Sequence, residues 1–141
     1  MSHQDEDFFK QLLSMFKLES DEHVGVITSG LVKMQETLSE DDRTNLLESV
    51  FRAAHSLKGA ARTVGLTDIE PIGQSLENVF SIMKNKKMDL SAELFNMLNQ
   101  AIKMLGVLIS SMDEQGKIIQ DKSELTRLID RINEHMILVG A

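Results

Sequence analysis

The residues around His55 have the types and the spacing that a phosphoryl-accepting site requires. Lys58 follows three residues later and Gly59 four residues later, within a stretch whose apolar residues recur at helical spacing. Residues three and four apart share one surface of a helix, so Lys58 would lie near the imidazole. Gly59 would leave the next turn free of a side chain, although a mid-helix glycine costs about 1 kcal/mol relative to alanine. A nucleophilic nitrogen, a neighbouring cation and open access together predict a histidine that accepts a phosphoryl group.

The helix that carries His55 is expected to bury a different face. At roughly 100° per residue, His55 lies about 120° from the centre of the apolar stripe and therefore on the flank of the helix. Lys58 is expected to pack its aliphatic stem while its ammonium reaches outward. Arg52 and Arg62 lie on the outer side and would give a phosphorylated imidazole a positive surround. From composition alone, an ordinary exposed or helix-filling histidine would be the favoured interpretation. The stripe comprises Leu46, Val50, Phe51, Ala54, Leu57, Ala61 and Val64.

The run F-R-A-A-H-S-L-K-G at residues 51–59 resembles the signature of histidine phosphotransfer (HPt) domains, most closely those of CheA-type chemotaxis histidine kinases. The segment L-E-N at residues 76–78 matches a second element of that family. The resemblance implies that His55 is the phosphoacceptor and that Glu77 bonds, orients and activates its ring. It also implies phosphate stabilisation by Lys58 and steric clearance at Gly59. A solvated surface glutamate is the alternative interpretation of Glu77.

Two positions depart from the CheA pattern. Gln74 stands where these domains often carry a second histidine, and a glutamine can donate a hydrogen bond but cannot titrate. Arg62 extends a run that is often made of small residues. It would either strengthen contact with phosphate or narrow the range of partners. The other histidines, His3, His23 and His135, show no comparable surroundings.

Apolar residues at helical spacing along nearly the whole chain predict an all-α protein. We expect an antiparallel bundle of about five helices with an up-down four-helix core, forming one domain over residues 1–141. Thr67 and Glu70 are expected to form a capping box, with Pro71 in the first turn of the third helix. Gly65 is expected to stop the second helix. The predicted helices span approximately residues 5–38, 42–64, 68–84, 91–113 and 122–138.

Composition excludes several function classes. The net charge of −7 argues against nucleic-acid binding, and no apolar run is long enough for a membrane span. The chain has no cysteine and no Glu-x-x-His pair, so neither a thiol site nor a helical metal site is expected. With no signal peptide at its start, a cytoplasmic protein is the expectation.

The family resemblance implies two partners. A separate histidine kinase catalytic domain would phosphorylate His55 from ATP, and a response-regulator receiver domain would take the phosphoryl group onto an aspartate. The chain has no glycine-rich nucleotide loop, so no cofactor is expected within it, and ATP and Mg²⁺ would belong to partner domains. It would then be a phosphotransfer module rather than a kinase by itself. Two alternatives are a freestanding phosphorelay protein that accepts from a receiver aspartate, and a non-catalytic helical adaptor.

Overall fold

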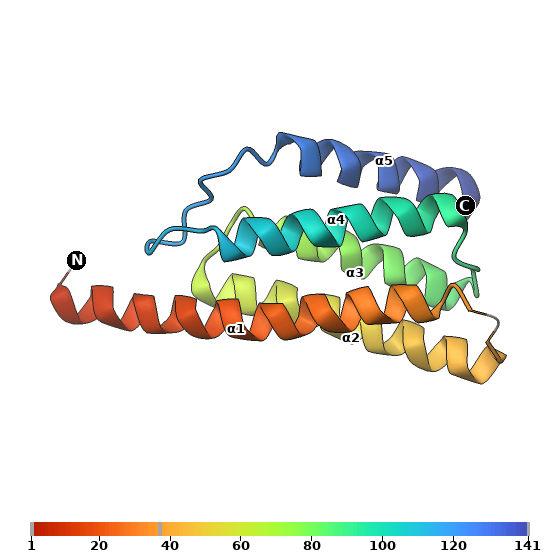
Figure 1. Cartoon of the computed structure of the whole chain (residues 1–141), viewed down its shortest axis with the longest axis horizontal. Coiled ribbons are helices and arrows are strands. Elements are labelled where there is room, and N and C mark those ends of the chain that lie inside the picture. Colours follow the sequence, from red (N-terminus) through yellow and green to blue (C-terminus); the bar gives the residue numbers. More distant parts are fainter. Residues whose placement is uncertain (1, 37, 141) are drawn as a thin grey trace.

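The computed structural model describes residues 2–36 and 38–140, and these residues form five helices and no strand. Successive helices run in opposite directions along one long axis (Figure 1). The prediction of an all-α, up-down bundle is therefore confirmed. The helices are α1 (His3–Lys33), α2 (Glu40–Val64), α3 (Glu70–Asn85), α4 (Ala92–Ser110) and α5 (Ser123–Gly140).

The helices contact one another in a closed order. α1 packs against α2 and α4, and α2 also packs against α3. α5 packs against both α3 and α4 and so covers the seam between them (Figure 1). The face shared by α2 and α3 is therefore left uncovered by the fifth helix.

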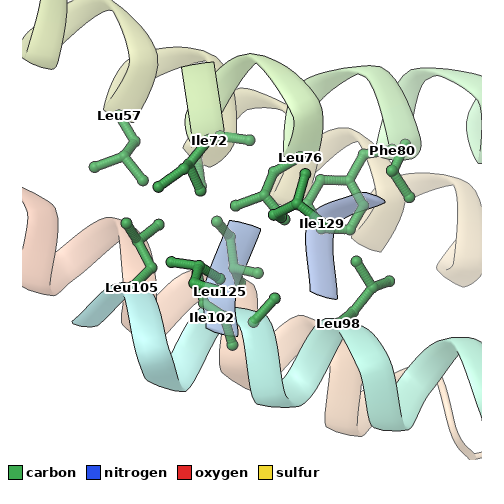
Figure 2. Packing of buried hydrophobic residues seen from close by; sticks show 14 of the residues in the cluster. Leu57, Ile72, Leu76, Phe80, Leu98, Ile102, Leu105, Leu125 and Ile129 are labelled. Carbon is green, nitrogen blue, oxygen red and sulfur yellow. The ribbon is translucent and has the colours of Figure 1, made fainter. Parts of the chain in front are cut away.

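One apolar core joins all five helices. Leu57 of α2, Leu76 of α3 and Leu105 of α4 are each no more than 1% exposed. The side chains labelled in Figure 2 come from α2, α3, α4 and α5 and meet at the centre of the bundle. Burial of each such side chain contributes roughly 1.5–3 kcal/mol, so the amphipathic stripes account for the bundle. The residues labelled there are Leu57, Ile72, Leu76, Phe80, Leu98, Ile102, Leu105, Leu125 and Ile129.

The ends of α2 follow from local chemistry. The Ser39 hydroxyl accepts a hydrogen bond from the Asp42 N–H at 3.1 Å, which caps the start of the helix. Gly65 ends the helix in the left-handed conformation, with φ of 83°. This confirms the predicted stop, because a residue with a side chain is disfavoured at that φ.

The predicted end of α1 is wrong. The helix ends at Lys33 instead of residue 38, and Gln35 and Glu36 form turns that bond back to Val32 and Lys33. Met34 caps the helix and Leu38 belongs to no helix, while Thr37 lies outside the described residues. The chain must reverse here so that α2 can pack along α1, and apolar periodicity does not report that requirement.

The other helix ends agree with the sequence prediction to within about two residues, except at the end of α4. α4 ends at Ser110 rather than residue 113, and the Lys17 ammonium binds the Met112 carbonyl at 2.9 Å in the segment that follows. The capping box is also wrong: Ile69 is the N-cap of α3 and makes no side-chain capping bond. The Glu70 carboxylate instead accepts a hydrogen bond from Arg62 of α2. Tertiary contacts with distant residues override the local signal in both cases.

Candidate functional site

The imidazole of His55 and the carboxylate of Glu77 meet at the face between α2 and α3. His55 Nδ1 lies 3.1 Å from Glu77 Oε2. The His55 side chain is 62% exposed, whereas the Glu77 side chain is only 15% exposed. The predicted flank position of His55 is thus confirmed. The structure also brings together the two residues that the sequence patterns single out.

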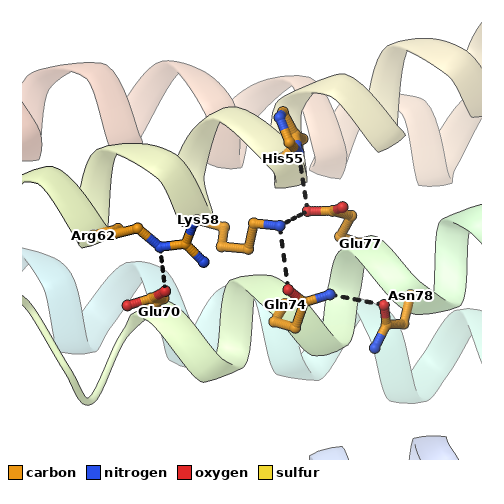
Figure 3. Close-up of polar contacts among 7 residues, drawn as sticks. All are labelled: His55, Lys58, Arg62, Glu70, Gln74, Glu77 and Asn78. Carbon is orange, nitrogen blue, oxygen red and sulfur yellow. Dashed lines mark hydrogen bonds and ion pairs between the residues drawn. The ribbon is translucent and has the colours of Figure 1, made fainter.

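The geometry fixes which ring nitrogen is free. Burial raises the pKa of Glu77, but hydrogen bonds from Lys58 and His55 outweigh it, so the net pKa of this carboxyl lies below its ordinary value. An ionised carboxylate can only accept hydrogen bonds, so the neutral imidazole carries its proton on Nδ1. Nε2 then holds the lone pair and points away from Glu77 (Figure 3). The ring presents an exposed nucleophile.

Lys58 is oriented differently from the sequence expectation. Its side chain is only 11% exposed, and Nζ lies 2.7 Å from the Glu77 oxygen that also faces His55. Nζ also donates to Gln74 Oε1 at 3.2 Å. The ammonium therefore does not reach outward; it is held between α2 and α3 (Figure 3). Its predicted role in stabilising phosphate stays a prediction.

Gln74 contacts Lys58, and its side-chain amide donates to Asn78 Oδ1 at 2.8 Å. The glutamine therefore extends a polar chain along α3 (Figure 3). Through this chain it fixes the position of the Lys58 ammonium.

The two predicted arginines lie on the outer side of α2. Arg52 Nε binds Glu48 Oε1 at 3.0 Å, and Arg62 Nε binds Glu70 Oε1 at 2.6 Å. Both guanidinium side chains are more than half exposed, at 76% and 65%. Each is partly neutralised by its carboxylate, and the positive surround predicted for a phosphorylated imidazole stays a prediction.

Two glycines shape the site in different ways. A Cβ at Gly59 would have no neighbour within 4 Å, so this glycine leaves open space beside the site. A Cβ at Gly73 would lie 3.1 Å from Lys58 Cα. Gly73 therefore lets α3 approach the backbone of α2, one turn before Glu77. Sequence reasoning missed it, because the need for a small residue appears only once the two helices are paired.

The sequence analysis also did not assign a second group of side chains to the site. These are Phe51, Lys84 and Glu48. The Phe51 ring is stacked beside the His55 ring, with centroids 6.3 Å apart and planes inclined by 14°. Lys84 Nζ lies 5.0 Å from the Phe51 centroid and 2.7 Å from Glu48 Oε2. The i, i+4 spacing of Phe51 and His55 was a usable signal. The position of Lys84 depends on how α3 pairs with α2.

The surroundings of His135 differ from those of His55. Its side chain is 16% exposed, and its Nδ1 lies 3.9 Å from Glu93 Oε2, beyond hydrogen-bonding distance. Within residues 2–36 and 38–140, no cluster of three or more His, Cys, Asp or Glu side chains could hold a metal ion. None of the helices described there is long and apolar enough to cross a membrane.

Comparison with known proteins identifies the family. The sequence model of the Hpt domain matches residues 11–134. The chain belongs to the Hpt domain family. The motif around His55 and the L-E-N segment both fall inside the matched region, in agreement with the resemblance found in the sequence.

The curated relatives are chemotaxis proteins. The chain is 32% identical over 127 residues to the chemotaxis protein CheA of Bacillus subtilis, covering 89% of this chain and 18% of that protein. It is 25% identical over 115 residues to CheA of Listeria monocytogenes, covering 80% and 18%. The CheA of Treponema pallidum is 25% identical over 118 residues, covering 82% and 14%. The chain thus spans less than a fifth of the length of these relatives.

Proposed function

We propose that this Hpt domain is a phosphotransfer module of CheA-type chemotaxis signalling, with His55 as its phosphoacceptor. The observation that carries the proposal is the 3.1 Å contact between His55 Nδ1 and Glu77 Oε2, which leaves Nε2 free on an exposed ring. The similarity to CheA proteins supports a kinase domain as the phosphodonor and a receiver domain as the acceptor. Because ATP is the proposed phosphate source, the proposal includes a cytoplasmic location.

In the first step the Nε2 lone pair attacks the γ-phosphorus of ATP held by the kinase domain. A P–N bond forms, the bond from phosphorus to the bridging oxygen breaks, and ADP leaves with the electron pair. Nδ1–H remains bonded to Glu77, whose negative charge stabilises the positive charge that develops on the ring. ATP and Mg²⁺ belong to the partner domain in this scheme.

In the second step a receiver aspartate takes the phosphoryl group. A carboxylate oxygen attacks phosphorus, the P–N bond breaks and its electron pair returns to Nε2. Arg52 and Arg62 lie exposed on the same helix as His55 and would lower the repulsion between a charged phosphoryl group and an acidic partner. Open space at Gly59 would let the partner approach.

The test is labelling by a CheA kinase domain with radiolabelled ATP, followed by a receiver domain. We expect an acid-labile, alkali-stable label on the wild type that the receiver removes. His55→Gln should carry no label and keep the helicity of the wild type, whereas His135→Gln, the matched control, should be labelled normally. A label retained by His55→Gln would overturn the assignment.

The same assay separates the alternatives. A freestanding relay protein would be labelled by a phosphorylated receiver and not by the kinase domain. A non-catalytic adaptor would be labelled by neither. The chain is similar to the CheA proteins of Bacillus subtilis and Listeria monocytogenes over 89% and 80% of its length. This similarity favours the kinase domain as phosphodonor.

A further inference from the structure

Glu77 restrains the His55 ring from one side only. The contact between Nδ1 and Oε2 is a single hydrogen bond on a side chain that is 62% exposed. Such a bond competes with water, and its net contribution is small. An exposed imidazole held at one atom can still rotate about its side-chain bonds, so a second contact is needed to keep Nε2 in one direction.

Phe51 supplies a second contact, one turn before His55 on the same helix. Its ring centroid lies 6.3 Å from that of the imidazole, and the two planes are inclined by 14°. This is an offset stacked arrangement within the range in which aromatic pairs attract. Phe51 is only partly buried against the core, so its own ring needs a partner on its exposed side.

Lys84 of α3 is that partner. Its Nζ lies 5.0 Å from the Phe51 centroid, within cation–π range, and 2.7 Å from Glu48 Oε2. The Lys84 ammonium is the main cause of the lowered pKa of the Glu48 carboxyl, which keeps this anchor ionised. Arg52 binds the other oxygen of Glu48. The cation over Phe51 is thus fixed by a carboxylate on the same helix as His55.

We propose that Lys84, anchored by Glu48, clamps the Phe51 ring against the His55 imidazole and thereby holds Nε2 in the orientation that accepts phosphate. Phe51 and Lys84 are positioning residues, because neither contacts the reacting atoms. The clamp joins α2 to α3, as the Glu77 contact does, but it acts through the Phe51 ring instead of through Nδ1. This inference rests on the proposed phosphoacceptor role of His55.

The first experiment labels His55 with phosphoramidate, a small donor that needs no protein docking. Its P–N bond breaks, a P–N bond to Nε2 forms, and ammonia leaves with the electron pair. We expect Phe51→Leu and Lys84→Met to slow labelling about threefold to tenfold, since each loses one aromatic or cation–π contact. Phe51→Tyr and Lys84→Arg should restore it. Phe95→Leu and Lys103→Met on α4 are the matched controls and should label at the wild-type rate.

The second experiment measures kcat and KM with the kinase domain, and the His55 tautomer ratio by nitrogen-15 NMR. The clamp predicts a lower kcat at unchanged KM and a more mixed tautomer population in Phe51→Leu and Lys84→Met. Wild-type labelling and tautomers in both variants would overturn the clamp, as would a change in KM alone, which would make this cluster a docking surface. If the His55→Gln variant is labelled like the wild type, the proposed function fails. The tautomer measurement still tests the clamp in that case.

Discussion

A single carboxylate oxygen organises the residues of this site. Glu77 Oε2 lies 3.1 Å from His55 Nδ1 and 2.7 Å from Lys58 Nζ. The two donors hold the pKa of Glu77 below its ordinary value despite partial burial, so the carboxylate stays ionised and keeps the proton on Nδ1. The arrangement with the proton on Nδ1 is therefore fully present above the ordinary glutamate pKa. It is lost as the pH falls through the lowered pKa of Glu77.

Removal of the orienting carboxylate should slow phosphorylation without unfolding the bundle. We expect Glu77→Ala to reduce phosphoryl uptake by about 10- to 100-fold, because a hydrogen bond to a charged group contributes roughly 1.5–3 kcal/mol. Nitrogen-15 NMR should show a mixture of His55 tautomers, and circular dichroism should show unchanged helicity. Unchanged tautomers would mean that Glu77 does not hold the ring in solution.

Lys58 should matter for stability as well as for transfer. Lys58→Met keeps the aliphatic stem but leaves the Glu77 carboxylate, only 15% exposed, without its closest cation. We expect a loss of about 1–3 kcal/mol in the free energy of unfolding, the cost of an unsatisfied buried polar group, measured by urea denaturation. Phosphoryl uptake should also slow. Lys58→Met combined with Glu77→Gln should cost less than the sum of the single changes, since the pair is removed together; strict additivity would contradict the pairing.

At the scale of helices, the close approach of α2 and α3 sets the distance between His55 and Glu77. A Cβ at Gly73 would lie 3.1 Å from Lys58 Cα and 3.2 Å from its backbone nitrogen, and backbone cannot move aside as a side chain end can. The apolar stripe of α3 predicted which face it buries. It did not predict how closely α3 approaches α2, because that distance depends on one small residue read in three dimensions.

The two glycines of the site should respond oppositely to alanine. Gly73→Ala should destabilise the bundle by about 1–3 kcal/mol, as overpacking does, and should slow labelling of His55 even with phosphoramidate. Gly59→Ala should stabilise it by up to about 1 kcal/mol, because alanine favours the helix and the space there is open. Thermal unfolding of the two variants tests whether the first is less stable and the second more stable than the wild type. If Gly59 provides clearance for a partner, Gly59→Ala should also slow transfer from the kinase domain but not from phosphoramidate.

The end of α2 was predictable because its signal is local: Gly65 stops the helix through its own backbone freedom. The start was expected at residue 42, whereas the Ser39 side chain caps a helix that begins at Glu40. The box expected from Thr67 and Glu70 does not form, because the Glu70 carboxylate binds Arg62 of the preceding helix. Long-range ion pairs of this kind compete with capping and cannot be read from spacing alone.

At the scale of the whole molecule, the site and the core occupy different parts of the bundle. The site residues come from α2 and α3, whereas α5 packs against α3 and α4 and covers the seam between them. The two sequence segments that carry the family resemblance predicted His55 and Glu77, which the structure brings together. The clamp of Phe51 and Lys84 required knowledge of how the two helices pair. This separation lets the site residues be changed while most of the core is kept.

The acid stability of the whole bundle should depend on carboxylates in the connection between α4 and α5. A hydrogen bond from the Lys117 N–H lowers the pKa of Asp113, outweighing the opposing effect of burial. The backbone and side chain of Ser123, at the start of α5, lower the pKa of Asp121. Groups with lowered pKa stabilise the fold above their ordinary pKa of about 3.9, and this contribution is lost as pH falls through the lowered pKa values.

We therefore expect the free energy of unfolding to decrease below about pH 4. The double variant Asp113→Asn, Asp121→Asn should be less stable at neutral pH and should lose less stability on acidification. Asp7→Asn, at an exposed position of α1, serves as the control. Urea denaturation at a series of pH values measures this, and a double variant with the pH dependence of the wild type would show that these carboxylates do not stabilise the fold.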